Sequence, residues 1–145
     1  MPSVSPPLAA LVPGVSAAGA LDRGDIEGLV DAGVRTIVNN RPDGEDPGQL
    51  PADEARLLAE SRGIAYHHIP VTAASLTRGD VNALAAVLAK AERPVVLHCR
   101  SGTRSTLLWA LVRLREGAEP SSLVADAARH GIDIAVLPAI AARLG

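Results

Sequence analysis

The stretch that decides the fold reads Pro94-Val-Val-Leu-His-Cys-Arg-Ser-Gly-Thr-Arg-Ser-Thr-Leu-Leu-Trp-Ala-Leu-Val-Arg-Leu114. It opens with an apolar run at 94–98, which is typical of a strand buried on both faces of a parallel sheet. It closes at 105–114 with residues that are apolar nearly all round, and these predict a buried helix. The polar segment between them therefore turns from strand to helix at the carboxyl edge of a sheet, where open α/β folds bind their ligands.

On both sides of this stretch the chain alternates between predicted strands and helices. Strands are expected near Val15 and over 35–39 and 64–71. Helical spacing and capping signals predict helices over 25–32 and 51–62, from the capping-box pair Thr77 and Asp80 onward, and over 121–130 and 133–144. Such alternation with about four strands implies a three-layer α/β/α fold with a mostly parallel sheet.

The size and composition are those of one globular domain. The chain has 145 residues, of which 48% are hydrophobic and 21% charged. These values exclude a disordered chain, a collagen-like chain and a disulfide scaffold. Residues 1–14 hold four prolines without periodicity and predict an irregular N-terminal arm, so a single domain is expected over 15–145.

Several classes of partner are disfavoured by the composition. One Trp, one Tyr and no Phe leave no aromatic platform for stacking bases, and a net charge of −2 gives no large positive field for a polyanion. No stretch of about 18 apolar residues lacks a charge or a proline. The first basic residue, Arg23, comes too late for a secretory signal. We therefore expect a cytoplasmic protein that binds neither nucleic acid nor membrane.

The segment His98-Cys-Arg-Ser-Gly-Thr-Arg-Ser105 carries the candidate chemistry. Its turn would aim backbone N–H groups and the positive end of a helix dipole at one point, which makes a cradle for an anion. Cys99 beside Arg104 would be favoured as the nucleophilic thiolate, and we expect these two residues to be catalytic. The other loop residues are expected to bind the anionic substrate: Arg100, Ser101, Gly102, Thr103 and Ser105. Ser105 would also donate a hydrogen bond to the sulfur.

A structural role for Cys99 is the alternative. A single cysteine after a buried strand is often a small core residue. Two arginines, a glycine and three hydroxyl side chains within one turn are, however, poor core material and good anion ligands. The surroundings of Cys99 therefore favour a functional site.

Three motifs in order resemble a known family: Val38-Asn-Asn-Arg-Pro-Asp-Gly-Glu45, Tyr66-His-His-Ile-Pro-Val71 and His98-Cys-Arg-Ser-Gly-Thr-Arg-Ser105. Together they are similar to the phosphatase-like domain of beta-lactamase-hydrolase-like proteins, small bacterial domains also described as sulfur transferases. The resemblance implies a dual-specificity-phosphatase-like fold, with a four-stranded parallel sheet and the cysteine loop after the last core strand. Members are sometimes fused to a persulfide dioxygenase. The resemblance therefore also implies a separate persulfide dioxygenase as a partner of this stand-alone form.

The spacing of the loop bears on the reaction. Cysteine phosphatases of this fold place five residues between the cysteine and the arginine, whereas four separate Cys99 from Arg104. The shorter loop, with Arg100 directly after the cysteine, is similar to the active loop of rhodanese-type sulfurtransferases. A smaller cradle suits the terminal sulfur of a persulfide better than a tetrahedral phosphoryl group.

The usual proton donor is also missing. Hydrolysis of a phosphate ester needs an acid for the leaving group, which phosphatases of this fold take from a loop about 30 residues before the cysteine. Here that loop, 72–77, has no carboxylate. The candidate accessory residues are Arg41, Asp43, Glu45, Asp46 and His98. The three acids would either supply a substitute donor or be solvated acids of a turn, and Arg41 would face the pocket or pair with an acid. Strand alternation turns His98 away from Cys99, so it would orient the loop through a backbone hydrogen bond.

The sequence thus favours a thiol sulfurtransferase that carries a persulfide on Cys99 and passes sulfane sulfur from thiosulfate or a low-molecular-weight persulfide to a thiol acceptor. The alternative is a cysteine-dependent protein tyrosine or dual-specificity-type phosphatase with a phosphocysteine intermediate. A third hypothesis is a non-catalytic anion- or redox-sensing module. The implied partners are a small anionic sulfur donor and a thiol. No cofactor is expected, and no metal, because His67 and His68 lie on opposite faces of a strand without further ligands at suitable spacing.

Overall fold

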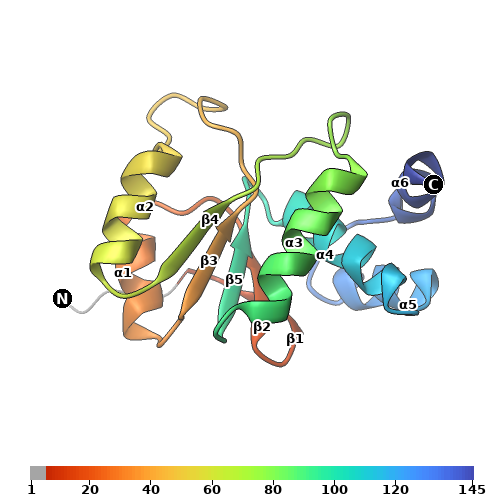
Figure 1. Cartoon of the computed structure of the whole chain (residues 1–145), viewed down its shortest axis with the longest axis horizontal. Coiled ribbons are helices and arrows are strands. Elements are labelled where there is room, and N and C mark those ends of the chain that lie inside the picture. The colour runs from red at the N-terminus through yellow and green to blue at the C-terminus, as the bar shows by residue number, and fades with distance from the viewer. Residues whose placement is uncertain (1–5) are drawn as a thin grey trace.

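The computed structural model describes residues 6–145 and contains a five-stranded sheet with the order β1-β2-β5-β3-β4 (Figure 1). The strands are β1 (Ala9–Val12), β2 (Val15–Ala18), β3 (Thr36–Asn39), β4 (Ala65–His68) and β5 (Val95–His98). β1 runs antiparallel to β2, and the other neighbouring strands are parallel. The expectation of a mostly parallel sheet is confirmed.

Helices cover both faces of this sheet. The helices on one face are α1 (Arg23–Asp31) and α2 (Ala52–Ser61). Those on the other are α3 (Arg78–Lys90) and α4 (Thr103–Arg115), and α5 (Pro120–Ala128) and α6 (Leu137–Leu144) extend that layer beside α4 (Figure 1). The three-layer α/β/α architecture predicted from the alternation of elements is therefore confirmed.

The core between the layers is mainly aliphatic. Consecutive residues of the central strand β5 point to opposite faces. Val96 packs with the α1 and α2 layer, and Leu97 packs with Leu84 and Leu108 in the α3 and α4 layer. Because both faces of β5 are covered, all four of its residues are buried, as the continuous apolar run predicts.

Several boundaries differ from the expectations. Residues 9–12 form β1, so the irregular arm expected over 1–14 is wrong for this part, and the sheet has five strands instead of about four. The prolines on both sides of this short segment conceal it in the sequence. Residues 1–5 of the expected arm lie outside the described residues. The last helix begins at Leu137 instead of 133, because Asp133 accepts the N–H of Ala135 and makes a local turn.

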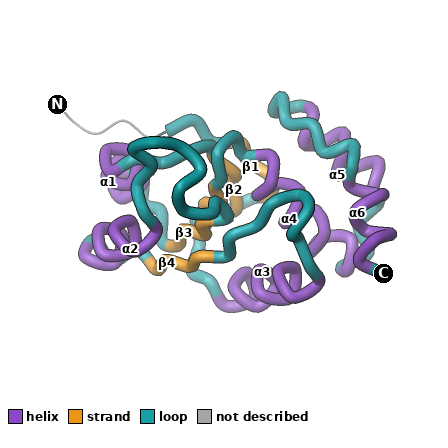
Figure 2. The backbone as a smooth tube through the Cα atoms, turned by 90° about the horizontal axis from the view of Figure 1, so that it is seen from above, coloured by secondary structure: helices purple, strands orange, loops and turns teal. Residues whose placement is uncertain are grey.

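The register of the central strands positions the site. His98, the last residue of β5, pairs with Ala18 at the end of β2 and with Asn39 at the end of β3. The three strands therefore end at one level, and the loops that follow them meet above the carboxyl edge of the sheet (Figure 2). In the described part of the chain, no helix has the length and apolar character needed to cross a membrane.

Candidate active site

Cys99 lies in the segment that joins β5 to the first turn of α4, residues 99–105, which we call the cysteine loop. Cys99 is fully buried, and the backbone N–H of Gly102 donates to its Sγ at 3.0 Å. Gly102 has a φ of +90°, which glycine adopts readily and other residues rarely do, and a Cβ there would lie 3.5 Å from the carbonyl oxygen of Ala18. Because α4 begins at Thr103, the positive end of its dipole is at the same loop. The backbone therefore presents a hydrogen-bond donor and the N-terminal end of a helix to the sulfur.

Arg104, in the first turn of α4, binds the Glu45 carboxylate through both terminal nitrogens of its guanidinium group. Nη1 donates to Glu45 Oε2 at 2.7 Å and Nη2 donates to Oε1 at 2.8 Å. Nη1 also donates to the carbonyl oxygen of Val71 at 3.0 Å. The hydrogen bonds to Glu45, and the nearby sulfur of Cys99, raise the pKa of Arg104. The guanidinium thus serves both the sulfur and a bidentate anionic partner.

That partner belongs to the loop between β3 and α2, residues 42–49, which we call the acidic loop. Arg41, directly before it, is buried, and donates to Glu45 Oε1 at 3.1 Å and to Asp46 Oδ2. Arg100 of the cysteine loop donates from Nε to the same Asp46 oxygen at 2.9 Å. Three arginines and two carboxylates therefore form one ion-pair network that joins the acidic loop to the cysteine loop. Of the two placements expected for Arg41, the structure has the pairing with acids.

The acidic loop is also fixed from within. Gln49 Oε1 accepts the backbone N–H groups of Glu45 at 3.0 Å and of Asp46 at 3.3 Å. Asp43 Oδ1 accepts the N–H of Ala52, the first residue of α2, at 2.9 Å, so Asp43 caps that helix. The loop is thereby held in place at both ends.

The three acids of the loop are not arranged as free proton donors. Hydrogen bonds from Arg104, and to a smaller extent from Arg41, lower the pKa of Glu45 to about 2. Asp43 is engaged as a helix cap, and Asp46 lies between two arginines. The segment is a turn with Asp43 and Glu45 at the surface, as the hypothesis of solvated turn acids predicts, but each acid is also engaged in an ion pair or a helix cap. This arrangement does not support the hypothesis that one of the acids is a substitute proton donor, because Glu45 is ionised at neutral pH.

Two asparagines after the apolar part of β3 brace the site, and the sequence reasoning missed their role. Asn40 is fully buried, donates from Nδ2 to the carbonyl of Ile69 at 3.0 Å, and accepts the hydroxyl of Ser105 at 2.8 Å. Asn39 donates to the hydroxyl of Tyr66 at 2.9 Å. The predicted hydrogen bond from Ser105 to the sulfur is therefore wrong, because Ser105 donates its single hydroxyl hydrogen to Asn40. Two adjacent polar residues at the end of a buried strand are the sequence signal that would have identified this role.

His98 is a buried neutral imidazole. Its burial lowers its pKa to about 4, and the charges of Arg41 and His68 act in the same direction, while a hydrogen bond with the backbone of Cys99 opposes them. Within the described residues, His98 Nδ1 has no hydrogen-bond partner. His98 therefore contacts the backbone of the loop and is uncharged at neutral pH, so it cannot act there as an imidazolium acid.

The remaining predicted site residues lie at the rim. The side chain of Arg100 is 65% exposed, and Ser101 donates its hydroxyl to that of Thr103 at 3.2 Å on the surface. Over residues 6–145, the structure brings together no group of three or more His, Cys, Asp or Glu side chains that could hold a metal ion.

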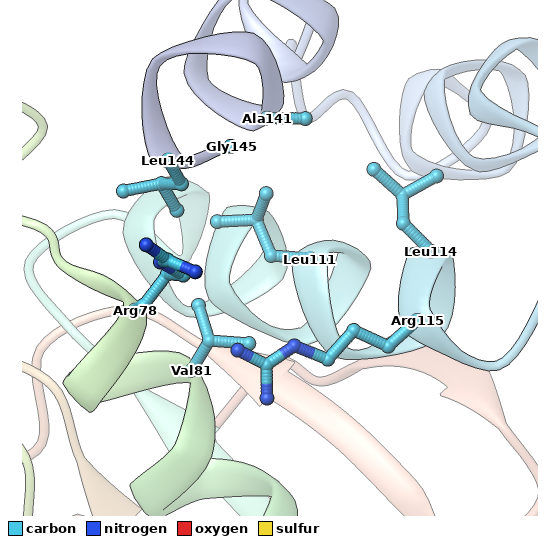
Figure 3. Close-up of a pocket in the computed structure, with 8 residues that line it drawn as sticks. All are labelled: Arg78, Val81, Leu111, Leu114, Arg115, Ala141, Leu144 and Gly145. Carbon is cyan, nitrogen blue, oxygen red and sulfur yellow. The ribbon is translucent and has the colours of Figure 1, made fainter.

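Two cavities help to delimit the site. One of about 280 Å³ is lined by Ser101 and Gly102 together with Ala18, His130 and Ile132, so it adjoins the cysteine loop on the β2 side. Another, of about 210 Å³, lies between α3, α4 and α6, and Arg78 and Arg115 reach toward its apolar lining (Figure 3). The second contains no residue of the cysteine loop or the acidic loop and is separate from the candidate active site.

Comparison with known proteins identifies relatives in sequence and in fold. Over 103 residues the chain is 38% identical to a beta-lactamase hydrolase-like protein of Xylella fastidiosa, a match that covers 70% of this chain and 24% of the relative. The chain thus spans about a quarter of the length of the curated relatives it matches. A crystal structure from Neisseria meningitidis, of a protein provisionally named a phosphatase, is 29% identical, with a TM-score of 0.81 and coverage of 97% of this chain and 96% of that one.

More distant structures share the fold alone. The catalytic core of the Saccharomyces cerevisiae phosphatase Siw14 is 14% identical, with a TM-score of 0.74 and coverage of 99% of this chain and 89% of that one. The fold is therefore that of dual-specificity-type phosphatases. These likenesses favour the phosphatase alternative over sulfur transfer, which they do not support. Residues 7–115 match the family described as the beta-lactamase hydrolase-like protein, phosphatase-like domain, and with most of its length inside that match the chain belongs to this family.

Proposed function

We propose that the chain is a cysteine-dependent phosphatase that acts on small phosphate esters through a phosphocysteine intermediate. One observation carries the proposal: Cys99 Sγ accepts the Gly102 N–H in the same loop that places the Arg104 guanidinium beside it. A thiolate there is an effective nucleophile. The loop amides and Arg104 would stabilise the oxygens of the phosphoryl group during transfer.

The proposed reaction consists of two successive displacements at phosphorus. The Cys99 thiolate forms a bond to phosphorus as the ester P–O bond breaks, and the leaving group departs with that electron pair. Water then attacks phosphorus, the S–P bond breaks with its electron pair going to sulfur, and the thiolate is released together with phosphate, whose oxygens keep the protons of the water. The Gly102 N–H and the positive end of α4 would stabilise negative charge in both steps, because both lie at the sulfur before substrate binds.

The acids near the site restrict the substrate. Glu45 is ionised at neutral pH, Asp43 caps α2, and 72–77 has no carboxylate. Without a proton donor, a leaving group must be stable as an anion. We therefore expect aryl phosphates or mixed anhydrides as substrates, in preference to alkyl phosphates.

A leaving-group series tests this function. The purified chain should hydrolyse p-nitrophenyl phosphate and release alkyl alcohols from phosphate esters at least about a hundredfold more slowly, the factor that a general acid usually supplies. Cys99→Ser should remove the activity toward both. Similar rates for aryl and alkyl esters would contradict the substrate restriction, and failure to hydrolyse any aryl phosphate would contradict the phosphatase proposal.

A second candidate function is sulfur transfer, which the spacing of four residues between Cys99 and Arg104 favours. The Cys99 thiolate would attack the outer sulfur of thiosulfate, the S–S bond would break, and sulfite would leave with the electron pair. A thiol acceptor would then take the outer sulfur from the Cys99 persulfide. This reaction needs no proton donor, and a separate persulfide dioxygenase could use its product.

Intact mass separates the two candidates. After incubation with thiosulfate, sulfur transfer predicts a gain of about 32 Da that Cys99→Ser lacks and that cyanide removes. The same experiment on the phosphatase predicts no lasting gain from thiosulfate. A stable sulfur adduct together with inactivity toward aryl phosphates would make the second candidate the function of this chain.

A further inference from the structure

The anion-binding groups of the cysteine loop already hold anions of the chain itself. Glu45 occupies both terminal nitrogens of Arg104 at 2.7 and 2.8 Å, and Asp46 occupies Nε of Arg100 at 2.9 Å. A carboxylate on a guanidinium fork has the same two-oxygen geometry as a bound phosphate or sulfate. The substrate's anionic group and Glu45 therefore need the same donors.

We propose that Glu45 is a built-in competitor of the substrate: an oxyanion binds at Cys99 only when it displaces the Glu45 carboxylate from Arg104. The proposal deepens the proposed function, since it concerns the same site, but it requires only that an anion binds there. It makes Glu45 a specificity-determining residue, because the incoming group must match what it replaces.

The structure gives the displaced carboxylate a place to go. Glu45 Oε1 also accepts from Nε of the buried Arg41 at 3.1 Å, and Gln49 binds the backbone N–H of Glu45 at 3.0 Å. These contacts do not involve Arg104. Rotation of the Glu45 side chain toward Arg41 would free the Arg104 fork while the acidic loop stays in place.

Competition of this kind selects among anions. An oxyanion that offers two oxygens to the Arg104 fork recovers both hydrogen bonds that Glu45 gives up. Chloride offers no second acceptor atom and cannot recover them. We therefore expect inorganic phosphate and sulfate to bind the cysteine loop, and chloride to bind much more weakly.

Titration calorimetry with sodium sulfate tests the proposal. Glu45→Gln removes the competing charge, so its Kd for sulfate should fall by about tenfold relative to the unaltered chain, within the usual range for two coupled binding events. Glu45→Asp, whose shorter side chain withdraws from the fork but keeps the charge at the site, should lower the Kd by a smaller factor. Glu54→Gln is the matched control, because Glu54 pairs with Arg23 on the surface at 2.9 Å, away from Arg104. It should leave the Kd unchanged.

The outcomes separate competition from a purely supporting role. If Glu45 only positions Arg104, both Glu45 variants will bind sulfate more weakly than the unaltered chain, and the proposal is wrong. An unchanged Kd in both would equally contradict it. Thermal unfolding of each variant shows whether it folds, and the Asp variant preserves the test if the Gln variant does not. Because sulfate binding requires no turnover, failure of the phosphatase proposal would leave this result interpretable.

Discussion

At the scale of single residues, the two arginines of the cysteine loop have different surroundings. The side chain of Arg104 is only 18% exposed and reaches the carbonyl of Val71 and the sulfur, whereas that of Arg100 is 65% exposed and pairs with Asp46. A buried fork can stabilise charge in a transition state, while an exposed charge is screened by solvent. The pair should therefore contribute unequally to the reaction.

Replacing each arginine by lysine measures that difference. Arg104→Lys keeps the charge but loses the fork, and we expect kcat/KM for an aryl phosphate to fall by about a hundredfold or more. Arg100→Lys should change KM by roughly threefold or less and leave kcat unaltered. Steady-state kinetics on both variants gives the comparison. Equal and small effects at both positions would contradict the role assigned to Arg104.

His98 makes the stability of the protein depend on pH. Its pKa is about 4 in the folded chain, below the usual value near 6.5, because it is buried. Between these values the unfolded chain binds a proton that the folded chain does not. The free energy of unfolding should therefore be at its full value above about pH 6.5, and it should fall by up to about 3 kcal/mol as the pH drops toward 4.

Urea unfolding at several pH values tests this dependence. His98→Asn should flatten the stability curve between pH 6.5 and 4, whereas the same change at the exposed His130 should leave the curve as it is. A curve that keeps its slope in the His98 variant would show that other groups cause it. Loss of stability below that window, as pH approaches the pKa of about 2 of Glu45, would be a separate effect.

At the scale of elements, the side chain of Asn40 connects three parts of the fold by hydrogen bonds. Asn40 follows β3, donates to Ile69 just after β4, and accepts from Ser105 in α4. Asn40→Ala leaves a buried carbonyl and a buried hydroxyl without these partners, so we expect a loss of about 2 to 3 kcal/mol of unfolding free energy. Asn82→Ala removes a single exposed hydrogen bond, which the side-chain oxygen of Asn82 in α3 accepts from Arg115, and should cost less than about 1 kcal/mol. Chemical denaturation of both variants makes the comparison, and equal losses would contradict the bracing role.

Asp43 offers a second test at this scale, since its contact is with the start of α2. Asp43→Ala should lower the stability by about 1 kcal/mol, the usual loss for a helix cap. It should leave the pH profile of aryl phosphate hydrolysis unchanged, because Asp43 donates no proton to the leaving group. A profile that loses its acidic limb in this variant would make Asp43 the substitute acid after all.

At the scale of the whole molecule, sequence patterns predict the three layers of the fold and the position of the cysteine loop. The apolar run at 94–98, and capping residues such as Thr77, act within a few neighbours, and each appears in the structure as predicted. The ion-pair network could not be predicted in this way. Arg104 and Glu45 are 59 residues apart in the sequence, and only the parallel register of β3 and β5 brings their loops together. The short β1 was missed because its pairing with β2 outweighs the prolines around it.

The central claim is that Cys99 is the nucleophile of a phosphoryl transfer, and the most direct test is the intact mass of the chain during turnover. Rapid acid quench of a reaction with p-nitrophenyl phosphate should trap a species heavier by about 80 Da, the mass of one phosphoryl group, with the added group on Cys99. Cys99→Ser should show neither the adduct nor turnover. Turnover without any adduct on Cys99, or activity that survives in Cys99→Ser, would contradict the account.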